Sequence, residues 1–170
     1  MGRAWMSLCA GAAAALVSAA ACDGGGPGGL ASDDGCGPAS GRVAQVIDGD
    51  TIGLESGERV RYLMVDTPEA TTDVECYGPE AARFNADLVD GAEVELSYDE
   101  ECADDYQRLL AYVTVREREI NALLVERGFG CAQYIPPNGA DRRDEFESLQ
   151  SQARAADRGL WAACPENPCN

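Results

Sequence analysis

The chain has 170 residues, and its content of 45% hydrophobic and 6% aromatic residues suits one domain with a modest core but not two. It contains no histidine, which argues against a zinc or iron centre and leaves a carboxylate as the expected proton acceptor near neutral pH. Thirty acidic residues against thirteen arginines, with no lysine and no basic run, give a net charge of −17, so the usual basic nucleic-acid-binding face is not expected.

The first 21 residues are typical of a signal peptide. Arg3 gives a positive start, residues 8–17 are apolar, and small residues precede Cys22. A cysteine at this place is typical of a bacterial lipoprotein processing site, although alanine stands where leucine is usual. We expect export, either as a cell-envelope lipoprotein attached to the membrane at Cys22 or as a freely secreted protein. Residues 22–40 are glycine-rich and predict a flexible tether.

The next stretch predicts a three-stranded meander with turn chemistry between the strands. The strands are expected at Val43–Ile47, Thr51–Leu54 and Val60–Val65. Asp48 and Gly49 suit a two-residue hairpin turn with positive φ at both central positions, so that Asp50 would begin the second strand. The third strand should end at Asp66, because Pro68 prevents further pairing and keeps the residue before it extended.

Asp50 and Asp66 then lie on adjacent antiparallel strands and are expected to be close together. Two carboxylates with a backbone carbonyl and water make an oxygen-only site, which a hard cation such as calcium prefers. Arg61 is the cationic side chain of this stretch. Simple alternation would place Arg61 and Asp66 on opposite faces, so their convergence requires a bulge or a turn beginning at Asp66.

The rest of the chain predicts three helices and two further strands. A helix should open at Gly78–Glu80 and end at Asp90, and two more are expected at Glu119–Arg127 and Asp141–Asp157. Strands are expected at Val94–Tyr98 and Leu109–Val115, on either side of an acidic loop. Five short strands with three helices fit an α+β, mainly β, fold, namely a five-stranded Greek-key barrel of the OB type.

Five motifs occur in an order that resembles the staphylococcal nuclease (thermonuclease) family: IDGDT, RYLMVDTPE, YGPEAARF, YQRLLAYV and RGLW. The likeness runs from about Gly41 to Trp161, which suggests a nuclease-like domain at 41–163 followed by a cysteine-containing tail at 164–170. The resemblance implies the OB-type fold and a monomeric, calcium-dependent nuclease that cleaves DNA and RNA with little sequence specificity.

The resemblance also implies roles for individual side chains. It suggests calcium ligands at Asp50, Asp66 and the carbonyl of Thr67, a general base at Glu69, and a phosphate clamp of Arg61 and Arg108. Tyr106 and Tyr134 match family tyrosines that lie near the bound nucleotide, where a ring can stack on a base. Taken singly, each of these residues also fits a structural role, as a turn cap, a surface charge or a partly buried tyrosine.

Several departures from the family pattern predict weak substrate affinity. Asp105 stands where the family has a lysine, Gln107 and Leu109 replace glycines beside the second arginine, and the loop between Glu69 and Tyr77 is short. Together with the net charge of −17, these features should repel a polyanion. An alternative is therefore a catalytically weak or inactive OB-type binding module on an envelope lipoprotein, and the acidity could also reflect a saline habitat.

Six cysteines lie beyond the processing site: Cys36, Cys76, Cys102, Cys131, Cys164 and Cys169. An even number in a small exported domain predicts up to three disulfides, with fifteen possible pairings. We expect Cys76 to pair with Cys102, because both fall in loops near the candidate site. We expect Cys36 to pair with Cys164 or Cys169.

Overall fold

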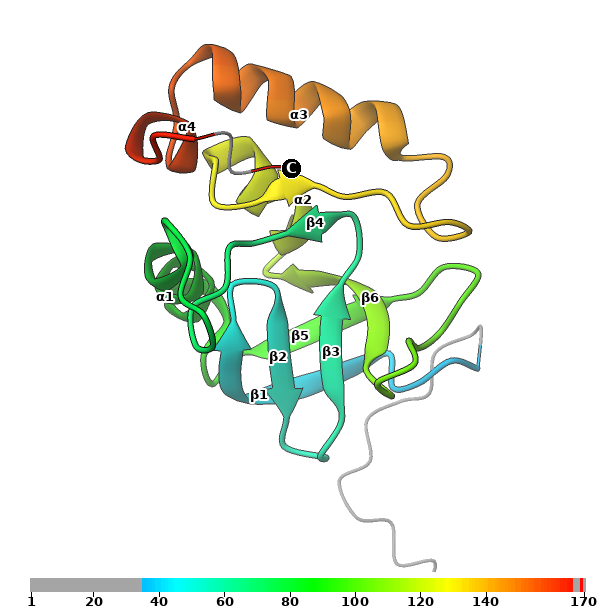
Figure 1. Cartoon of the computed structure of the whole chain (residues 1–170). Helices are drawn as coiled ribbons and strands as arrows, with labels where there is room; N and C mark the ends of the chain where they lie inside the picture. Colours follow the sequence, from blue (N-terminus) through cyan, green and yellow to red (C-terminus); the bar gives the residue numbers. More distant parts are fainter. Residues whose placement is uncertain (1–34, 167–168, 170) are drawn as a thin grey trace, which may run out of the picture.

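The computed structural model describes residues 35–166 and 169, so the predicted signal peptide, Cys22 and most of the tether lie outside the described residues. Figure 1 shows a β-barrel with helices at one end and one side. The elements are β1 (Ser40–Asp48), β2 (Thr51–Leu54), β3 (Arg59–Tyr62), β4 (Val65–Asp66), α1 (Gly78–Val89), β5 (Glu93–Ser97), β6 (Leu109–Val115), β7 (Arg118–Glu119), α2 (Ile120–Arg127), β8 (Cys131–Ala132), α3 (Arg143–Ala155) and α4 (Leu160–Ala163).

The larger sheet closes into a five-stranded barrel. Its antiparallel order is β3-β2-β1-β5-β6, with the short β7 beyond β6, and a parallel pairing of β3 with β6 joins the two ends. This closure places Arg61 opposite Leu110. The predicted OB-type fold is confirmed, and the closing pairing brings the strand that carries Arg61 beside the strand that Arg108 precedes.

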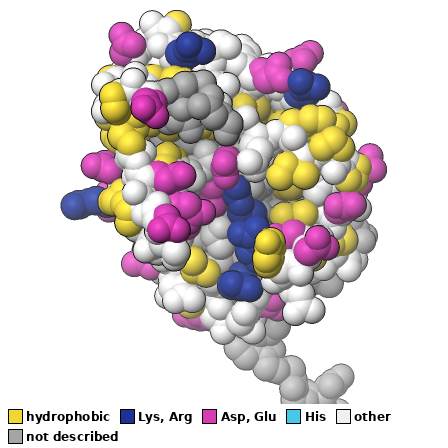
Figure 2. Space-filling view, in the orientation of Figure 1, with side chains coloured by type: hydrophobic (Ala, Val, Ile, Leu, Met, Phe, Trp, Pro, Cys, Tyr) yellow, Lys and Arg dark blue, Asp and Glu magenta, His cyan; other side chains and the backbone are white. Residues whose placement is uncertain are grey.

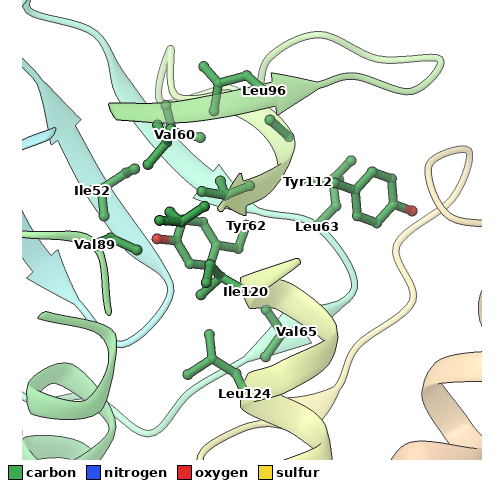
Figure 3. Close-up of a cluster of buried hydrophobic side chains, with 14 of the residues drawn as sticks. Ile52, Val60, Tyr62, Leu63, Val65, Val89, Leu96, Tyr112, Ile120 and Leu124 are labelled. Carbon is green, nitrogen blue, oxygen red and sulfur yellow. The ribbon is translucent and has the colours of Figure 1, made fainter. Parts of the chain in front are cut away.

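The barrel interior is filled by aliphatic side chains from alternating strand positions, as Figure 3 shows. Ile52, Val60 and Val113 are fully shielded from solvent. Ile120 and Leu124 of α2 close one end of this core, and α3 packs on the outer side of α2 with Phe146 buried. No helix in the described part of the chain is both long and apolar enough to cross a membrane.

A tight turn separates β3 from β4 where one continuous strand was predicted. Met64 has a φ of 64°, a left-handed conformation that reverses the side-chain alternation. The buried amide of Asn121 fixes this turn by donating to the carbonyl of Leu63 at 2.9 Å, and the Leu63 N–H donates to Ala111 at 3.0 Å. The change of direction predicted between Arg61 and Asp66 therefore occurs, but at Leu63 and Met64 instead of at Asp66.

The first hairpin also differs from its prediction. The turn residues are Gly49 and Asp50, with Asp48 paired to Thr51, so Asp50 lies in the turn and does not begin β2. Neither turn residue has a positive φ angle. Gly49 is required for a different reason, because a Cβ at this position would collide with the side chain of Thr67.

All six cysteines beyond the processing site form disulfides, but the predicted pairings were wrong. The bonds join Cys36 to Cys102, Cys76 to Cys164, and Cys131 to Cys169. Cys102 lies close to the start of β1, where the Tyr98 hydroxyl donates to the carbonyl of Pro38. Sequence position alone could not show which chain end lies beside each loop, because only the folded topology decides this.

Reduction of these disulfides is expected to lower the Tm by about 10 °C or more, since in the chain-entropy model each bond contributes about 3–5 kcal/mol by restricting the unfolded chain. The bonded residues are separated by 66, 88 and 38 positions. Circular dichroism melting with and without a reducing agent measures the effect. An unchanged Tm under conditions where thiol titration shows complete reduction would contradict the expectation.

Candidate active site

A cavity of about 620 Å³ opens between the β3–β4 turn, the loop before β6 and the segment after β8. Arg61, Asp66 and Arg108 all line it. Figure 2 shows arginine side chains in a row down one face of the molecule, with a group of acidic side chains beside them. Three of the residues singled out in the sequence thus share one cavity.

Asp50 is buried at the β1–β2 turn, and most of its contacts fall on Oδ2. Its side chain accepts hydrogen bonds from the Thr67 N–H at 2.8 Å, the Thr67 hydroxyl at 3.0 Å and the Thr51 hydroxyl at 3.0 Å. Only 5% of the residue is exposed. A buried carboxylate is tolerated when it has this many donors together with a cation, so its position is well defined.

Arg61 of β3 provides that cation. Its Nη1 lies 2.6 Å from Asp50 Oδ2 and donates to the carbonyl of Val65 at 2.8 Å, and its Nη2 lies 2.7 Å from Asp66 Oδ1. Asp50 and Asp66 therefore meet at one guanidinium. The sequence predicted that the two carboxylates lie close together, but not that Arg61 joins them. The turn at Met64 makes this possible by returning the chain toward Arg61.

Asp66 lies at the exposed edge of this group, with its side chain 49% exposed. Burial raises the pKa of Asp66, Arg61 opposes this, and the charge of Asp50 adds to the rise. Arg61 contacts only Oδ1, and Oδ2 has no partner among the described residues. This oxygen is therefore free for a ligand that enters the cavity.

Glu69 is exposed and lies beside a second carboxyl group, that of Asp48. A hydrogen bond with Asp48 raises the pKa of Glu69 to about 7, and burial and the charges of Asp48, Asp50 and Glu75 add to the rise. The backbone here is fixed by the Glu69 N–H, which donates to Glu75 at 3.1 Å, and by Gly78, where a Cβ would collide with the Glu69 carbonyl. Glu69 does not line the large cavity, and the charges that act on it are those of Asp48, Asp50 and Glu75.

The residues present fit a hard divalent cation. Burial, followed by the charges of Asp50 and Glu75, raises the pKa of Asp66, and the hydrogen bond with Asp48, followed by burial and by the charges of Asp48, Asp50 and Glu75, raises that of Glu69, so several carboxyl groups gather near Arg61. No group of three side-chain ligands that could hold a metal occurs among the described residues. An ion here would therefore need backbone and water oxygens besides carboxylates, and the ligand set of Asp50, Asp66 and the Thr67 carbonyl stays a prediction.

Arg108 also lines the cavity and lies immediately before β6, the strand that pairs with β3. Its Nε and Nη2 both lie 2.7 Å from Asp104 Oδ2. The side chain is 26% exposed, so it is accessible from the cavity. The two predicted phosphate-binding arginines thus border the same space, and each is held by carboxylates.

The two tyrosines lie differently from one another. Tyr106 is 73% exposed, with the Arg108 guanidinium 5.5 Å from its ring centre. Tyr134 is partly buried against the core, with Arg143 over its ring, and its neighbours Gln133 and Ile135 line the cavity instead. The wall after β8 is therefore formed by Gln133 and Ile135, and the substrate-binding role of Tyr134 finds no support from its position.

Three residues at the site were not singled out in the sequence. Asp48 contacts Glu69, Glu75 holds the Glu69 backbone, and Asp104 holds Arg108. Asp48 could have been noticed as the first acid of the IDGDT motif. The other two lie in acidic loops where the sequence offers several carboxylates and no sign of which one turns inward.

Comparison with known proteins agrees with this geometry. A family model described as "Staphylococcal nuclease homologue" matches residues 59–163. A thermonuclease of Staphylococcus intermedius is 38% identical over 125 residues, covering 70% of this chain and 74% of that protein. A thermonuclease of Staphylococcus hyicus is 34% identical, covering 71% and 75%, and the endonuclease YncB of Bacillus subtilis is 33% identical, covering 69% and 59%. The chain belongs to the family of staphylococcal nuclease homologues.

Proposed function

We propose that this protein is an exported, calcium-dependent nuclease that hydrolyses phosphodiester bonds of DNA and RNA with little sequence specificity. The observation that carries the proposal is the convergence of Arg61, Asp66 and Arg108 on one cavity, with Asp50 paired to Arg61. Phosphodiester hydrolysis needs a water nucleophile, compensation for the charge of the non-bridging oxygens and stabilisation of the leaving oxygen.

The two arginines supply the charge compensation. A guanidinium donates paired hydrogen bonds to phosphate oxygens and stays charged at every relevant pH. Arg61 is oriented by Asp50, Asp66 and a backbone carbonyl, so little side-chain entropy is lost when phosphate binds. Arg108 lines the same cavity just before β6, the strand beside β3.

Glu69 is the proposed general base. Its exposed position lets a water molecule reach the carboxylate, and its backbone is held in place on both sides. A calcium ion held by Asp50, Asp66 and the Thr67 carbonyl would supply positive charge that stabilises the negative charge developing on the phosphate. Besides their proposed role as calcium ligands, Asp50 and Asp66 orient Arg61.

Low sequence specificity and modest affinity follow from the same residues. Arginines that contact phosphate carry no information about the base, so they support cleavage of many sequences and of both DNA and RNA. The net charge of −17 repels a polyanion at long range, and capture therefore depends on the local arginines and on screening by salt.

Export is supported by the three disulfides, because such bonds persist mainly in oxidising compartments. The lipoprotein-like sequence at Cys22 suggests an anchor that holds the nuclease at the cell envelope. The tether after Cys22 would then separate the domain from the membrane surface.

The test is cleavage of labelled DNA and RNA strands with calcium or with a chelator, by the wild type and by Asp66→Asn. We expect calcium-dependent cleavage by the wild type and a loss of about 100-fold or more in the variant, which lacks a charged ligand. Calcium at about 100 times its Kd should also stabilise the wild type by about 2.7 kcal/mol, an effect that Asp66→Asn should lose. Glu80→Gln, on the exposed start of α1, is the control for loss of one carboxylate.

The alternative binding module predicts a different result. Such a protein would bind oligonucleotides with similar affinity in calcium and in chelator and would leave them intact. Equal, background-level cleavage by the wild type and Asp66→Asn would therefore reject the nuclease and favour the module.

A further inference from the structure

One carboxylate, that of Asp104, organises the loop that carries Arg108. Its Oδ1 accepts the N–H groups of Tyr106 and Arg108, each at 3.0 Å. Its Oδ2 lies 2.7 Å from both Nε and Nη2 of Arg108. The same side chain therefore fixes the backbone of the turn with one oxygen and the guanidinium with the other.

The turn around Asp104 is further constrained by its backbone. Gln107 has a φ of 60°, and its N–H donates to the Asp104 carbonyl at 2.9 Å. A left-handed conformation costs a non-glycine residue about 1–2 kcal/mol, so the surrounding bonds must maintain it. The disulfide at Cys102 and the hydrogen bond from Leu110 to the Cys102 carbonyl hold the base of the loop. Arg108 thus projects from a rigid support.

The contact with Asp104 leaves part of the guanidinium available. An arginine has five N–H donors arranged on two edges. Asp104 occupies the edge formed by Nε and Nη2, and Nη1 has no hydrogen-bond partner among the described residues. Because Arg108 and Asp104 both line the cavity, the free edge can be offered to a phosphate while the occupied edge holds the side chain still.

We infer that Asp104 is a positioning residue, which orients Arg108 so that its free edge meets the scissile phosphate. This role rests on the proposed nuclease function. It predicts that Asp104 assists catalysis although its negative charge, taken alone, opposes the binding of an anionic substrate. Hydrogen bonds from Arg108 and Tyr106 and the charge of Arg108 overcome the effect of burial and lower the pKa of Asp104, so the group stays charged at neutral pH.

The negative charge of Asp104 could position Arg108 or could only repel the substrate, and these two roles predict different results for Asp104→Asn. The amide oxygen of asparagine can still accept the two backbone N–H groups, so the turn is retained while the hold on the guanidinium is lost. If Asp104 positions Arg108, kcat should fall by about 100-fold, the typical cost of misplacing a reacting group by an ångström. If its charge only repels substrate, KM should fall and kcat should stay the same.

Glu100→Gln is the matched control, because Glu100 is an exposed acid of the same loop that does not line the cavity. It removes the same charge and should leave kcat unchanged. A similar fall of kcat in Asp104→Asn and Glu100→Gln would overturn the positioning role, because the effect would then be one of net charge.

A double-mutant cycle with Arg108→Ala shows whether Asp104 acts through Arg108. In the Arg108→Ala background, the substitution Asp104→Asn should change kcat by no more than about twofold, because the residue to be positioned is already absent. A loss as large as in the wild-type background would overturn the inference, as would an unchanged kcat in Asp104→Asn alone.

Hydrogen exchange at Arg108 tests the positioning contact independently of nuclease activity. In NMR spectra of the ¹⁵N-labelled protein, the Arg108 Nε–H should exchange slowly with solvent in the wild type and rapidly in Asp104→Asn. Rapid exchange in both proteins overturns the positioning contact, whether or not the protein cleaves nucleic acid. A wild type with the slow signal but with no cleavage in calcium overturns the nuclease function, and with it the catalytic part of this role.

Discussion

Glu69→Gln is expected to lower kcat by about 1,000-fold, within the range of about 10²–10⁴ typical of a general acid or base. Glutamine keeps the size of the side chain and can still hydrogen-bond to Asp48, but it cannot accept a proton from water. Since Glu69 is exposed, the Tm should stay close to that of the wild type. Single-turnover cleavage in calcium, with circular dichroism melting, measures both quantities.

The control for Glu69→Gln is Glu80→Gln, which makes the same chemical change at an exposed position of α1. This variant should keep the wild-type rate. If Glu69→Gln retained the wild-type rate as well, the general base would have to be another group, and Asp48 would be the first to examine because it shares a hydrogen bond with Glu69.

Arg61→Ala is expected to affect both activity and folding. Loss of a guanidinium that stabilises the negative charge of the transition state should lower kcat/KM by about 1,000-fold or more. The substitution also leaves Asp50 buried without its cation, and breaking a buried ion pair in this way costs about 3–5 kcal/mol of folding stability. Urea denaturation without calcium measures the second effect, because a bound cation would partly replace the lost charge.

Alanine variants of two other arginines are the comparisons for Arg61→Ala. Arg83→Ala, on the exposed face of α1, should change stability by no more than about 0.5 kcal/mol. Arg108→Ala should lower the rate with little loss of stability, because its partner Asp104 remains partly exposed. A variant Arg61→Ala as stable as Arg83→Ala would contradict the structural role assigned to the Arg61–Asp50 pair.

The barrel could be predicted from the sequence because each strand carries recognisable signals within its own few residues. Alternating apolar residues, turn dipeptides and the proline after Asp66 each constrain the backbone within a few residues. The left-handed turn at Met64 has no such signal, since methionine rarely adopts positive φ and the conformation is imposed by Asn121, far along the chain. The convergence of Arg61 and Asp66 could therefore be predicted, but not the turn that produces it.

The partners of the functional residues were harder to predict than the residues themselves. The motifs indicated Asp50, Arg61 and Arg108, yet the disulfide pairs and the contact between Asp104 and Arg108 depend on which loops meet in space. The segment after β8 is a second example of side-chain positions that the sequence could not predict. Tyr134 was chosen by its chemical type, whereas its neighbours Gln133 and Ile135 line the cavity.

The acidity of the chain is compatible with catalysis if positive charges in the site attract the substrate phosphate at short range. Long-range repulsion is screened over about 8–10 Å at physiological salt, whereas the contacts of Arg61 and Arg108 act within hydrogen-bonding distance. Added salt should therefore assist the first encounter with substrate, in contrast to a basic nuclease, whose affinity falls steadily as salt rises.

The most direct test is the initial rate of cleavage of a single-stranded oligonucleotide by the wild-type protein in calcium, measured over a salt series beside Glu69→Gln. We predict a calcium-dependent rate far above that of the variant, which increases from low to moderate salt as repulsion is screened. A wild-type rate equal to that of Glu69→Gln at every salt concentration would contradict the account.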